Sequence, residues 1–376
     1  EEGITLVKAG WGNMRLFGIL HAQLAASDLA DTADARHTEF RLARMDLILE
    51  GNFWNRKIGY YIEGDMANVA GFLLDARVSV MPAQGLEIRI GRFIPDFTYF
   101  MPACKSGLMA IDYPLVTSSL APWHQVGLEI MFRHKYFELI GGVFNGMRFK
   151  KTMDPSSHYI SIPEMADGYT GATWENLSDD NMGKDVLFTF LVKPVKGLAL
   201  GGYIYYGMPQ YTWRDTGIGE FKDEMANMIL YGFEVRYLNE KFTILAEYAM
   251  RRLYYPDGAT SLLYNEEERR FTYPSVSPDP TLSHGAYLHA GYRFISMLEI
   301  MLRGDYFDAD LDSDLGQEIW GTLGLNWYLD GIHARMTLEY ILKARQRWKD
   351  PEAPAQDLEA ERYIDHGVAF QLALFL

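Results

Sequence analysis

The sequence predicts an all-β fold, a single 16-stranded antiparallel transmembrane β-barrel that takes up residues 1–376 as one domain. Three observations lead to this prediction. Apolar and polar residues alternate over segments of about ten residues, the length of a strand that crosses a bilayer at a tilt. The connections between these segments alternate between short and long. The polar face of nearly every segment carries a charged residue, which a packed core does not tolerate unpaired.

The alternation is clearest in the second half of the chain. Every second residue from 229 to 237 is apolar or aromatic, with Glu234 and Arg236 on the opposite phase. The segments 185–194 and 197–208 alternate poorly, so their phase is the least well defined. The predicted strands span residues 13–24, 40–50, 57–66, 72–81, 85–93, 124–133, 135–145, 185–194, 197–208, 226–238, 241–253, 284–295, 297–306, 317–329, 331–345 and 366–376.

The connections are tight at one end of the predicted strands and longer at the other. The tight turns are residues 51–56, 82–84, 134, 195–196, 239–240, 296 and 330. The longer loops are residues 25–39, 67–71, 94–123, 146–184, 209–225, 254–283, 307–316 and 346–365. This layout is typical of an outer-membrane barrel with short periplasmic turns and long extracellular loops. An even number of strands places both chain ends on the turn side.

Composition and the absence of repeats exclude several other classes. Strands of a β-sandwich are shorter, about five or six residues, and propellers need a repeat of fixed period that the sequence lacks. The chain has 35 Lys+Arg against 50 Asp+Glu, a formal net charge of −15, which disfavours nucleic acid as a partner. The single Cys104 excludes an internal disulfide and a cysteine-based metal site. No apolar run is long enough for a transmembrane helix, and we expect a mature chain whose signal peptide has been removed.

The third of the longer loops, residues 94–123, is unusually apolar for a loop of this length. It contains Phe97, Tyr99, Phe100, Met101, Leu108, Met109, Ile111, Tyr113 and Leu115. Ordered loops this long are commonly functional, and water is a poor environment for so many apolar side chains. We therefore expect this loop to fold into the barrel and narrow the channel. The alternative is a loop that packs over the barrel mouth or against a neighbouring protomer.

If the apolar phase faces lipid, the other phase lines the lumen with nearly balanced charge. Residues two apart, such as Asp75 and Arg77 or Glu87 and Arg89, then both point inward. Taken singly, most of these charges are expected only to keep the lumen hydrated. The residues predicted to line the pore or its constriction are Arg15, Arg44, Asp46, Asp75, Arg77, Glu87, Arg89, Asp96 and Lys105.

Five short stretches resemble the phosphate-selective porin O and P family of outer-membrane porins. They are residues 41–51 (RLARMDLILEG), 91–97 (GRFIPDF), 121–128 (APWHQVGL), 142–146 (GVFNG) and 322–329 (TLGLNWYL), in the order in which the family has them. The resemblance implies a 16-stranded barrel in the outer membrane of a Gram-negative bacterium, usually a homotrimer, with one loop folded into the pore. It implies diffusive passage of small hydrophilic solutes and ions, with a preference for anions or phosphate.

Two features depart from the family pattern. The family's phosphate channels carry a lysine cluster on the inserted loop, whereas loop 94–123 has only Lys105 as a basic residue, opposed by Asp96 and Asp112. The chain also ends in Leu376, where outer-membrane barrels usually end in an aromatic residue. A weakly selective pore therefore fits the sequence at least as well as a phosphate channel. The expected partners are small polar or anionic solutes and outer-membrane lipid or lipopolysaccharide, and no cofactor is expected.

Other candidate sites and functions are weaker. A calcium site is suggested by Asp308, Asp310, Asp312 and Asp314, but the sixth position of the loop lacks its glycine and the twelfth its glutamate. No local catalytic motif occurs, and we expect no enzyme, although a Ser-His-Asp site assembled from distant residues is the alternative that a serine-reactive probe would reveal. A barrel that mainly docks another outer-membrane protein is a second alternative, motivated by the long aromatic loops 146–184 and 254–283.

Overall fold

The computed structural model of the chain describes most of the barrel and part of its loops. The described residues are 3–28, 36–67, 73–101, 108–146, 148–149, 183–214, 221–254, 263–265, 270–272, 280–311, 317–331, 333–348 and 360–375. Within these residues no helix is long and apolar enough to cross a membrane.

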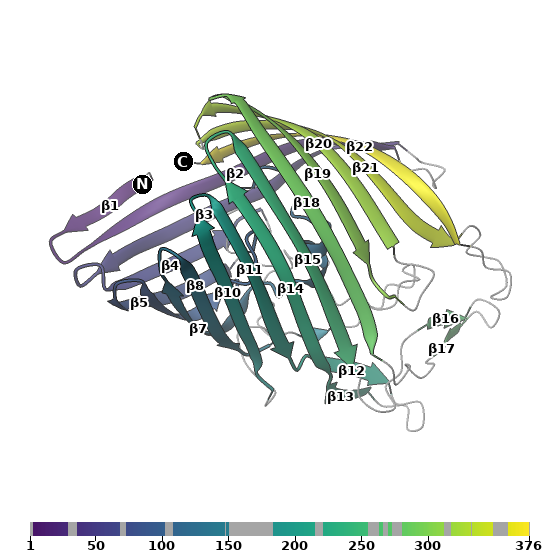
Figure 1. Cartoon of the computed structure of the whole chain (residues 1–376), viewed down its shortest axis with the longest axis horizontal. Helices are drawn as coiled ribbons and strands as arrows, with labels where there is room; N and C mark the ends of the chain where they lie inside the picture. The colour runs from purple at the N-terminus through teal and green to yellow at the C-terminus, as the bar shows by residue number, and fades with distance from the viewer. Residues whose placement is uncertain are drawn as a thin grey trace.

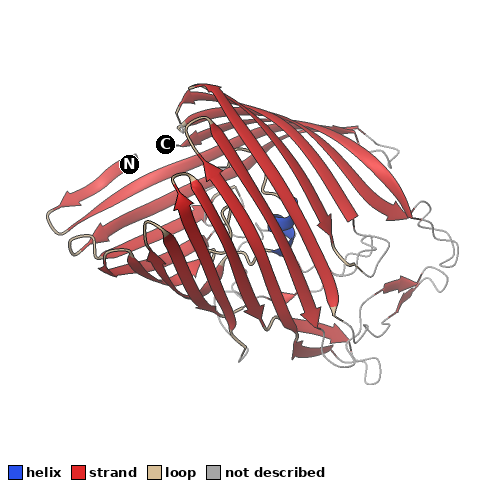
Figure 2. Ribbon diagram, viewed as in Figure 1, coloured by secondary structure: helices blue, strands red, loops and turns tan. Residues whose placement is uncertain are grey.

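Sixteen antiparallel strands form a closed ring, as the sequence predicts (Figures 1 and 2). Each strand pairs with its neighbours along the chain, and β2 pairs with β22 to close the ring. The strands of the ring are β2 (Gly12–Asp28), β3 (Arg36–Phe53), β4 (Ile58–Asp65), β5 (Leu73–Ala83), β6 (Leu86–Phe93), β7 (Gln125–Arg133), β8 (Phe137–Phe144), β10 (Asp185–Val195), β11 (Leu198–Gly207), β14 (Asn227–Leu238), β15 (Phe242–Tyr254), β18 (Thr281–Ile295), β19 (Leu298–Asp308), β20 (Gln317–Asp330), β21 (Ala334–Trp348) and β22 (Ala360–Phe375).

A further strand, β1 (Ile4–Ala9), extends the seam of the barrel and was not predicted. It forms a hairpin with the first residues of β2, where Ile4 pairs with Leu16. The longer remaining part of β2, from Ile19 to Asp28, pairs with β22, with Ile19 opposite Phe375. β1 therefore continues the edge of β2 where β22 ends, and the first strand starts part-way up the seam rather than at the turn side.

Small elements lie outside the ring. The two-residue strand β9 (Arg148–Phe149) pairs with β12 (Gln210–Arg214), which pairs with β13 (Phe221–Met225). A short hairpin joins β16 (Leu263–Asn265) and β17 (Arg270–Thr272). One short helix, α1 (Leu115–Leu120), belongs to the third loop.

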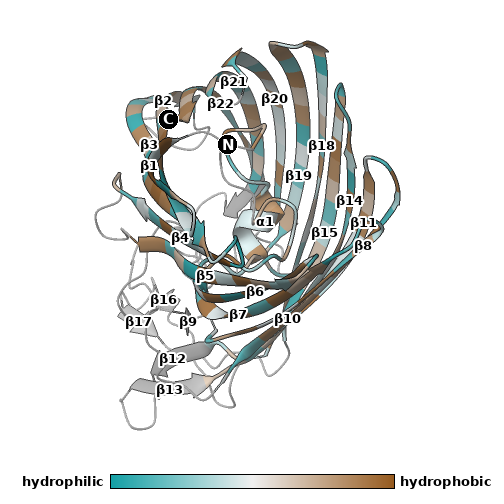
Figure 3. Ribbon diagram, turned by 90° about the vertical axis from the view of Figure 1, so that its left-hand side faces the viewer, coloured by the Kyte–Doolittle hydropathy of each residue, from teal (hydrophilic) through white to brown (hydrophobic). Residues whose placement is uncertain are grey.

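Hydrophilic and hydrophobic residues alternate along the strands (Figure 3), and burial shows which of them face the outside of the barrel. In β10, Phe188 and Phe190 are exposed on the outer surface, whereas Leu187 and Thr189 are buried inside. The same alternation runs along the other strands, so a broad apolar band covers the outside. Such a surface is stable in hydrocarbon and not in water. The phase of β10, poorly defined by the sequence, is thereby resolved.

Aromatic side chains mark both ends of the apolar band, as in membrane barrels. On the turn side the rings of Phe242 and Tyr292 lie 4.8 Å apart between centroids. On the loop side Tyr248 and Tyr306 both lie close to His284.

A β-bulge in β3 changes the inward phase of that strand. His21 pairs with Arg44 and Ala22 with Leu42, so Ala43 is the extra residue. The bulge lets Leu42 and Met45 both face lipid, where they are exposed.

Candidate functional site

The third loop lies inside the barrel, as predicted from its apolar content. Residues 94–101 and 108–123 of this loop are described, and α1 stands within the ring of strands (Figures 2 and 3). Phe97, Phe100 and Val116 are almost completely buried and belong to one cluster with the inward-facing Tyr203 and Tyr287. The loop thus fills part of the lumen with a dry apolar core, which rests against the wall from β8 to β19.

Carboxylates of the wall hold the loop through its backbone. Glu129 of β7 accepts a hydrogen bond from the N–H of Asp96 at 2.9 Å, and Glu234 of β14 accepts one from the N–H of Tyr99 at 3.1 Å. Without these acceptors the buried N–H groups would be unsatisfied.

The second half of the loop reaches the opposite part of the ring. Asp305 of β19 accepts from the N–H of Leu115 at 2.9 Å, and Glu339 of β21 accepts from the N–H of Ile111 at 2.7 Å. Asn326 of β20 donates to the carbonyl of Met109 at 2.8 Å. Because these strands lie far around the ring from β7, the loop crosses the lumen from one side to the other.

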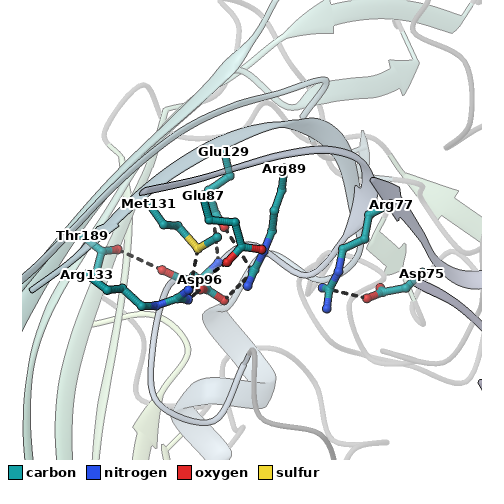
Figure 4. Close-up of polar contacts among 9 residues, drawn as sticks. All are labelled: Asp75, Arg77, Glu87, Arg89, Asp96, Glu129, Met131, Arg133 and Thr189. Carbon is teal, nitrogen blue, oxygen red and sulfur yellow. Dashed lines mark hydrogen bonds and ion pairs between the residues drawn. The ribbon is translucent and has the colours of Figure 1, made fainter. Parts of the chain in front are cut away.

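A cluster of paired charges lies where the loop leaves β6 (Figure 4). Arg89 donates to Glu87 at 2.8 Å and lies 3.3 Å from Asp96. Arg133 donates to the same two carboxylates, at 3.0 Å and 2.8 Å. Glu129 adds a third carboxylate, 3.5 Å from Arg89. Two guanidinium groups therefore share three carboxylates, and one of these, Asp96, belongs to the loop itself.

Charged residues two apart along a strand form ion pairs with each other, because both point into the lumen. Arg77 donates to Asp75 at 3.2 Å. In the same way Arg236 pairs with Glu234, and Arg303 donates to Asp305 at 2.8 Å. Each pair cancels its own charge, so the wall is strongly polar and nearly neutral.

The predicted residues of β2 and β3 form a second group on the adjoining part of the wall, where Glu63 of β4 pairs in register with Asp75 of β5. Arg44 forms an ion pair with Asp46 and lies 3.2 Å from Glu63, and all three side chains are nearly buried. Arg15 donates to Glu50 at 2.6 Å, nearer the turn side. The predicted pore residues therefore fall into two clusters, one on β2–β4 and one on β5–β7 with the loop.

Strict alternation missed two arginines of the inner wall, Arg41 and Arg92. The bulge at Ala43 turns Arg41 inward, where it donates to Gln23 at 2.6 Å. The signal is in the sequence, since the apolar phase changes from Phe40 and Leu42 to Met45.

Arg92 was missed for a different reason. It follows Gly91, whose φ of 133° breaks the regular strand geometry. The Arg92 guanidinium is buried and donates to the carbonyls of Leu73 and His124, both at 3.3 Å. It thus ties the end of the third loop to the adjoining wall.

Two neighbouring cavities on the turn side of the loop share lining residues, and most of the charged residues that line them are basic. The inner one, of about 240 Å³, is lined by Arg77, Arg89, Arg133 and Arg236 together with Asp96 and Glu138. The outer one, of about 540 Å³, shares Glu138 and Arg236 with it and adds Lys135, Lys193 and Lys196. Among the described residues Lys135 and Lys196 have no ion-pair partner, so this turn-side vestibule is more basic than the rest of the lumen.

Two predicted sites fall wholly or partly outside the described residues. Lys105 lies outside them, as do Asp312 and Asp314 of the weak calcium pattern. Asp308 accepts hydrogen bonds from the N–H of Asp310 at 3.2 Å and from the Tyr306 hydroxyl at 3.4 Å. Over the part of the chain that is described, no group of three or more His, Cys, Asp or Glu side chains is arranged to hold a metal ion.

Solved structures share this architecture. No protein-family model and no curated protein sequence matches the chain. The anion-selective porin from Comamonas acidovorans superposes with a TM-score of 0.63 at 11% identity, over 97% of this chain and 100% of that chain. The outer-membrane channel DcaP of Acinetobacter baumannii gives 0.61 at 11% identity, over 100% and 99%. The fold is that of outer-membrane porins. Salmonella typhi OmpF, solved with daunomycin, gives 0.57 at 12% identity, over 98% and 100%.

Proposed function

We propose that the chain is an integral outer-membrane porin of a Gram-negative bacterium and passes small hydrophilic solutes and ions by diffusion. The observation that carries this proposal is the closed barrel with an apolar outer band, a charged inner wall and one loop across the lumen. Membrane barrels of this kind have long loops on the extracellular side. The loop side therefore faces outward from the cell, and the turn-side vestibule opens toward the periplasm.

The third loop, residues 94–123, acts as the constriction in this proposal. Its apolar core closes part of the lumen, and solutes pass between the loop and the wall of β2–β6. Paired charges along this passage, such as Arg89 with Glu87 and Arg15 with Glu50, keep it polar and hydrated. A hydrated passage with a strongly polar, nearly neutral wall favours polar, hydrated solutes over apolar ones.

We further infer weak selectivity with a modest preference for anions. Nearly every described arginine of the constriction is paired with a carboxylate, which lowers its attraction for a passing anion. The unpaired Lys135 and Lys196 of the turn-side vestibule supply the excess positive charge. Binding of phosphate in particular remains what the resemblance to the phosphate-selective family implies, and Lys105, the basic residue on which it would depend most, lies outside the described residues.

Single-channel recording in a planar bilayer under a KCl gradient tests this proposal. Steady conductance with a reversal potential shifted toward chloride supports an anion-preferring porin. Block of the chloride current by added phosphate would support the narrower phosphate function, and a shift toward potassium would contradict the anion preference. Absence of conductance would contradict the porin and favour the docking alternative, whose motivating loops 146–184 and 254–283 lie largely outside the described residues.

We also propose a homotrimer, as the family resemblance implies. Native mass spectrometry of the detergent-solubilised protein measures the number of copies directly. A mass of three chains supports the proposal, whereas a single chain of 43.0 kDa contradicts it.

A further inference from the structure

The turn-side vestibule has an apolar surface on a wall that is otherwise polar. Its outer cavity, of about 540 Å³, is lined by Tyr136 and Leu238. Tyr136 lies two residues before the inward-facing Glu138. Leu238 lies two residues after the inward-facing Arg236, so both side chains point toward the lumen. Tyr136 is 56% exposed and Leu238 37%. Apolar side chains that stay exposed inside a hydrated lumen favour a solute that covers them.

Tyr99 of the third loop forms another part of this apolar surface. Its ring centroid lies 5.3 Å from that of the buried Phe100 and 5.2 Å from the guanidinium carbon of Arg236. Its N–H donates to Glu234, so the loop and the wall together hold the ring in place. Leu191 lines both the outer and the inner cavity. Aromatic and aliphatic walls with a few polar groups, in a cavity of this size, are typical of a small-molecule site.

Arg236 lies where the two cavities meet, since it lines both of them. It donates to the two oxygens of Glu234 through Nε, at 3.0 Å, and through Nη2. No described residue accepts a hydrogen bond from its Nη1. A guanidinium group can hold a carboxylate through two parallel hydrogen bonds on each of its edges. Glu234 occupies one edge of Arg236, and the Nη1–Nη2 edge is available to a second carboxylate.

The inner cavity, of about 240 Å³, offers further hydrogen-bond donors to the same ligand group. Thr98 lines it and is 1% exposed, and its hydroxyl has no hydrogen-bond partner within the described part of the chain. Arg77, drawn in Figure 4, lines the cavity too and donates to the protein through a single hydrogen bond, to Asp75 at 3.2 Å. A buried hydroxyl without a partner costs free energy, which an anionic oxygen in the cavity would recover.

The charge around the two cavities suits a ligand with a single negative charge. Four arginines and three lysines line the cavities, and six carboxylates form ion pairs with them, so the group carries a net charge of +1. The turns 134–136 and 195–197, which border the outer cavity, are both described. One carboxylate neutralises the excess charge, whereas a phosphate dianion reverses it. The six paired carboxylates are Asp75, Glu87, Asp96, Glu129, Glu138 and Glu234.

We infer that the turn-side vestibule binds organic monocarboxylates with an aromatic body, the class to which benzoate belongs. The carboxylate pairs with the Nη1–Nη2 edge of Arg236, and the ring lies in the outer cavity against Tyr99, Tyr136 and Leu238. Aromatic rings in contact add to the free energy of apolar burial. This inference rests on the proposed function, because it takes the vestibule to lie on the path of diffusing solutes. It narrows the solutes from hydrophilic ions in general to anions with an apolar body.

Equilibrium dialysis of the detergent-solubilised protein against three small probes tests the inference. Benzoate carries both the ring and the charge, acetate lacks the ring, and benzyl alcohol lacks the charge. Benzoate should bind at least tenfold more tightly than either of the others, because burial of about half of a phenyl ring is worth roughly this factor.

Two variants separate the apolar and the charged part of the site. Y136S/L238S should bring the affinity for benzoate to that for acetate and leave acetate binding within twofold. R236K keeps a cation beside Glu234 but removes the second guanidinium edge, so it should weaken benzoate and acetate binding alike, by at least fivefold.

Matched controls come from the same end of the barrel. Arg293 lies 3.3 Å from Glu299 and over the ring of Tyr328 at 4.4 Å, as Arg236 does with Glu234 and Tyr99, but it lines neither cavity. R293K should therefore bind all three probes within twofold of the natural chain. W11S/M297S, which removes two exposed apolar side chains of other turns, should do the same.

Three outcomes would overturn the inference. They are benzoate binding no tighter than acetate, succinate binding tighter than benzoate, and unchanged benzoate binding in Y136S/L238S. Dialysis does not depend on conduction, so the two proposals fail separately. Conductance without benzoate binding contradicts this inference alone, and benzoate binding by a chain that does not conduct contradicts the porin proposal alone.

Discussion

Neutralising two carboxylates of the charge cluster around Arg89 and Arg133 should raise the permeability of the channel to anions relative to cations. The double substitution E87Q/D96N removes two negative charges and keeps one oxygen acceptor at each position, so that Arg89 and Arg133 can each retain one of their two hydrogen-bond acceptors. The group of five charges formed with Glu129 then changes from a net −1 to a net +1. The loop should stay in place, because its apolar core and its other wall contacts are untouched.

The size of the effect follows from Coulomb's law at the width of a hydrated passage. An ion ~7 Å from a unit charge in water feels about 0.6 kcal/mol, and salt at 0.1 M reduces this to roughly 0.3 kcal/mol. Two charges give about 0.6 kcal/mol, so a monovalent anion is favoured roughly threefold and a cation disfavoured by the same factor. The ratio of chloride to potassium permeability should therefore rise about eightfold.

Reversal potentials in a KCl gradient measure this ratio. The control is E240Q, which removes one negative charge from an exposed turn between β14 and β15, away from the cluster. A change of less than twofold in the ratio of chloride to potassium permeability in E87Q/D96N would refute the reasoning, because ions would then pass too far from these carboxylates to interact with them. The effect should also shrink as the salt concentration rises, because screening shortens the range of the charges.

Three further predictions concern the loop and its wall. R44A leaves two nearly buried carboxylates without their arginine partner and should lower the free energy of unfolding by about 3–5 kcal/mol, measured with guanidinium chloride. An unchanged free energy of unfolding would mean that water already reaches these carboxylates. E339A leaves the Ile111 N–H without its acceptor, at about 1–3 kcal/mol, so hydrogen exchange across residues 108–115 should quicken, whereas E339Q should preserve the protection and equal rates would contradict the anchor. F100A removes a buried ring from the loop core at about 3–5 kcal/mol and should make the loop more susceptible to protease, whereas F40A on the lipid face should not; equal cleavage of the two would argue against an apolar anchor.

The number of strands could be predicted because the bilayer imposes the alternation of apolar and polar residues on every strand separately. Each strand must show lipid an apolar face and water a polar one, so the period of two survives in the sequence without knowledge of its neighbours. The inward fold of the third loop was predictable for a similar reason, since Phe97 and Phe100 need an apolar environment wherever the loop goes.

The wall contacts of the loop were not predictable, because they join residues that are distant in the chain. Glu339 and Ile111 are 228 residues apart, and Glu234 and Tyr99 are 135 apart. Alternation places both glutamates in the lumen but does not say which backbone group each of them meets. The bulge at Ala43 is an intermediate case, since the change of apolar phase was visible in the sequence while its effect on Arg41 required the register.

Two strands, β1 and β22, share one edge of β2, and this arrangement affects how the barrel assembles. An unpaired strand edge attracts other chains, and the edge of β2 stays open until β22, the last strand made, arrives to close the ring. The β1 hairpin needs only local contacts, which form early in folding, and it covers the part of that edge, Gly12–Leu16, with which β22 does not pair. Before β22 pairs, the folding barrel therefore exposes a shorter unpaired edge of β2 to other chains. Deleting residues 4–9 should therefore increase aggregation during refolding more than it lowers the stability of the finished barrel.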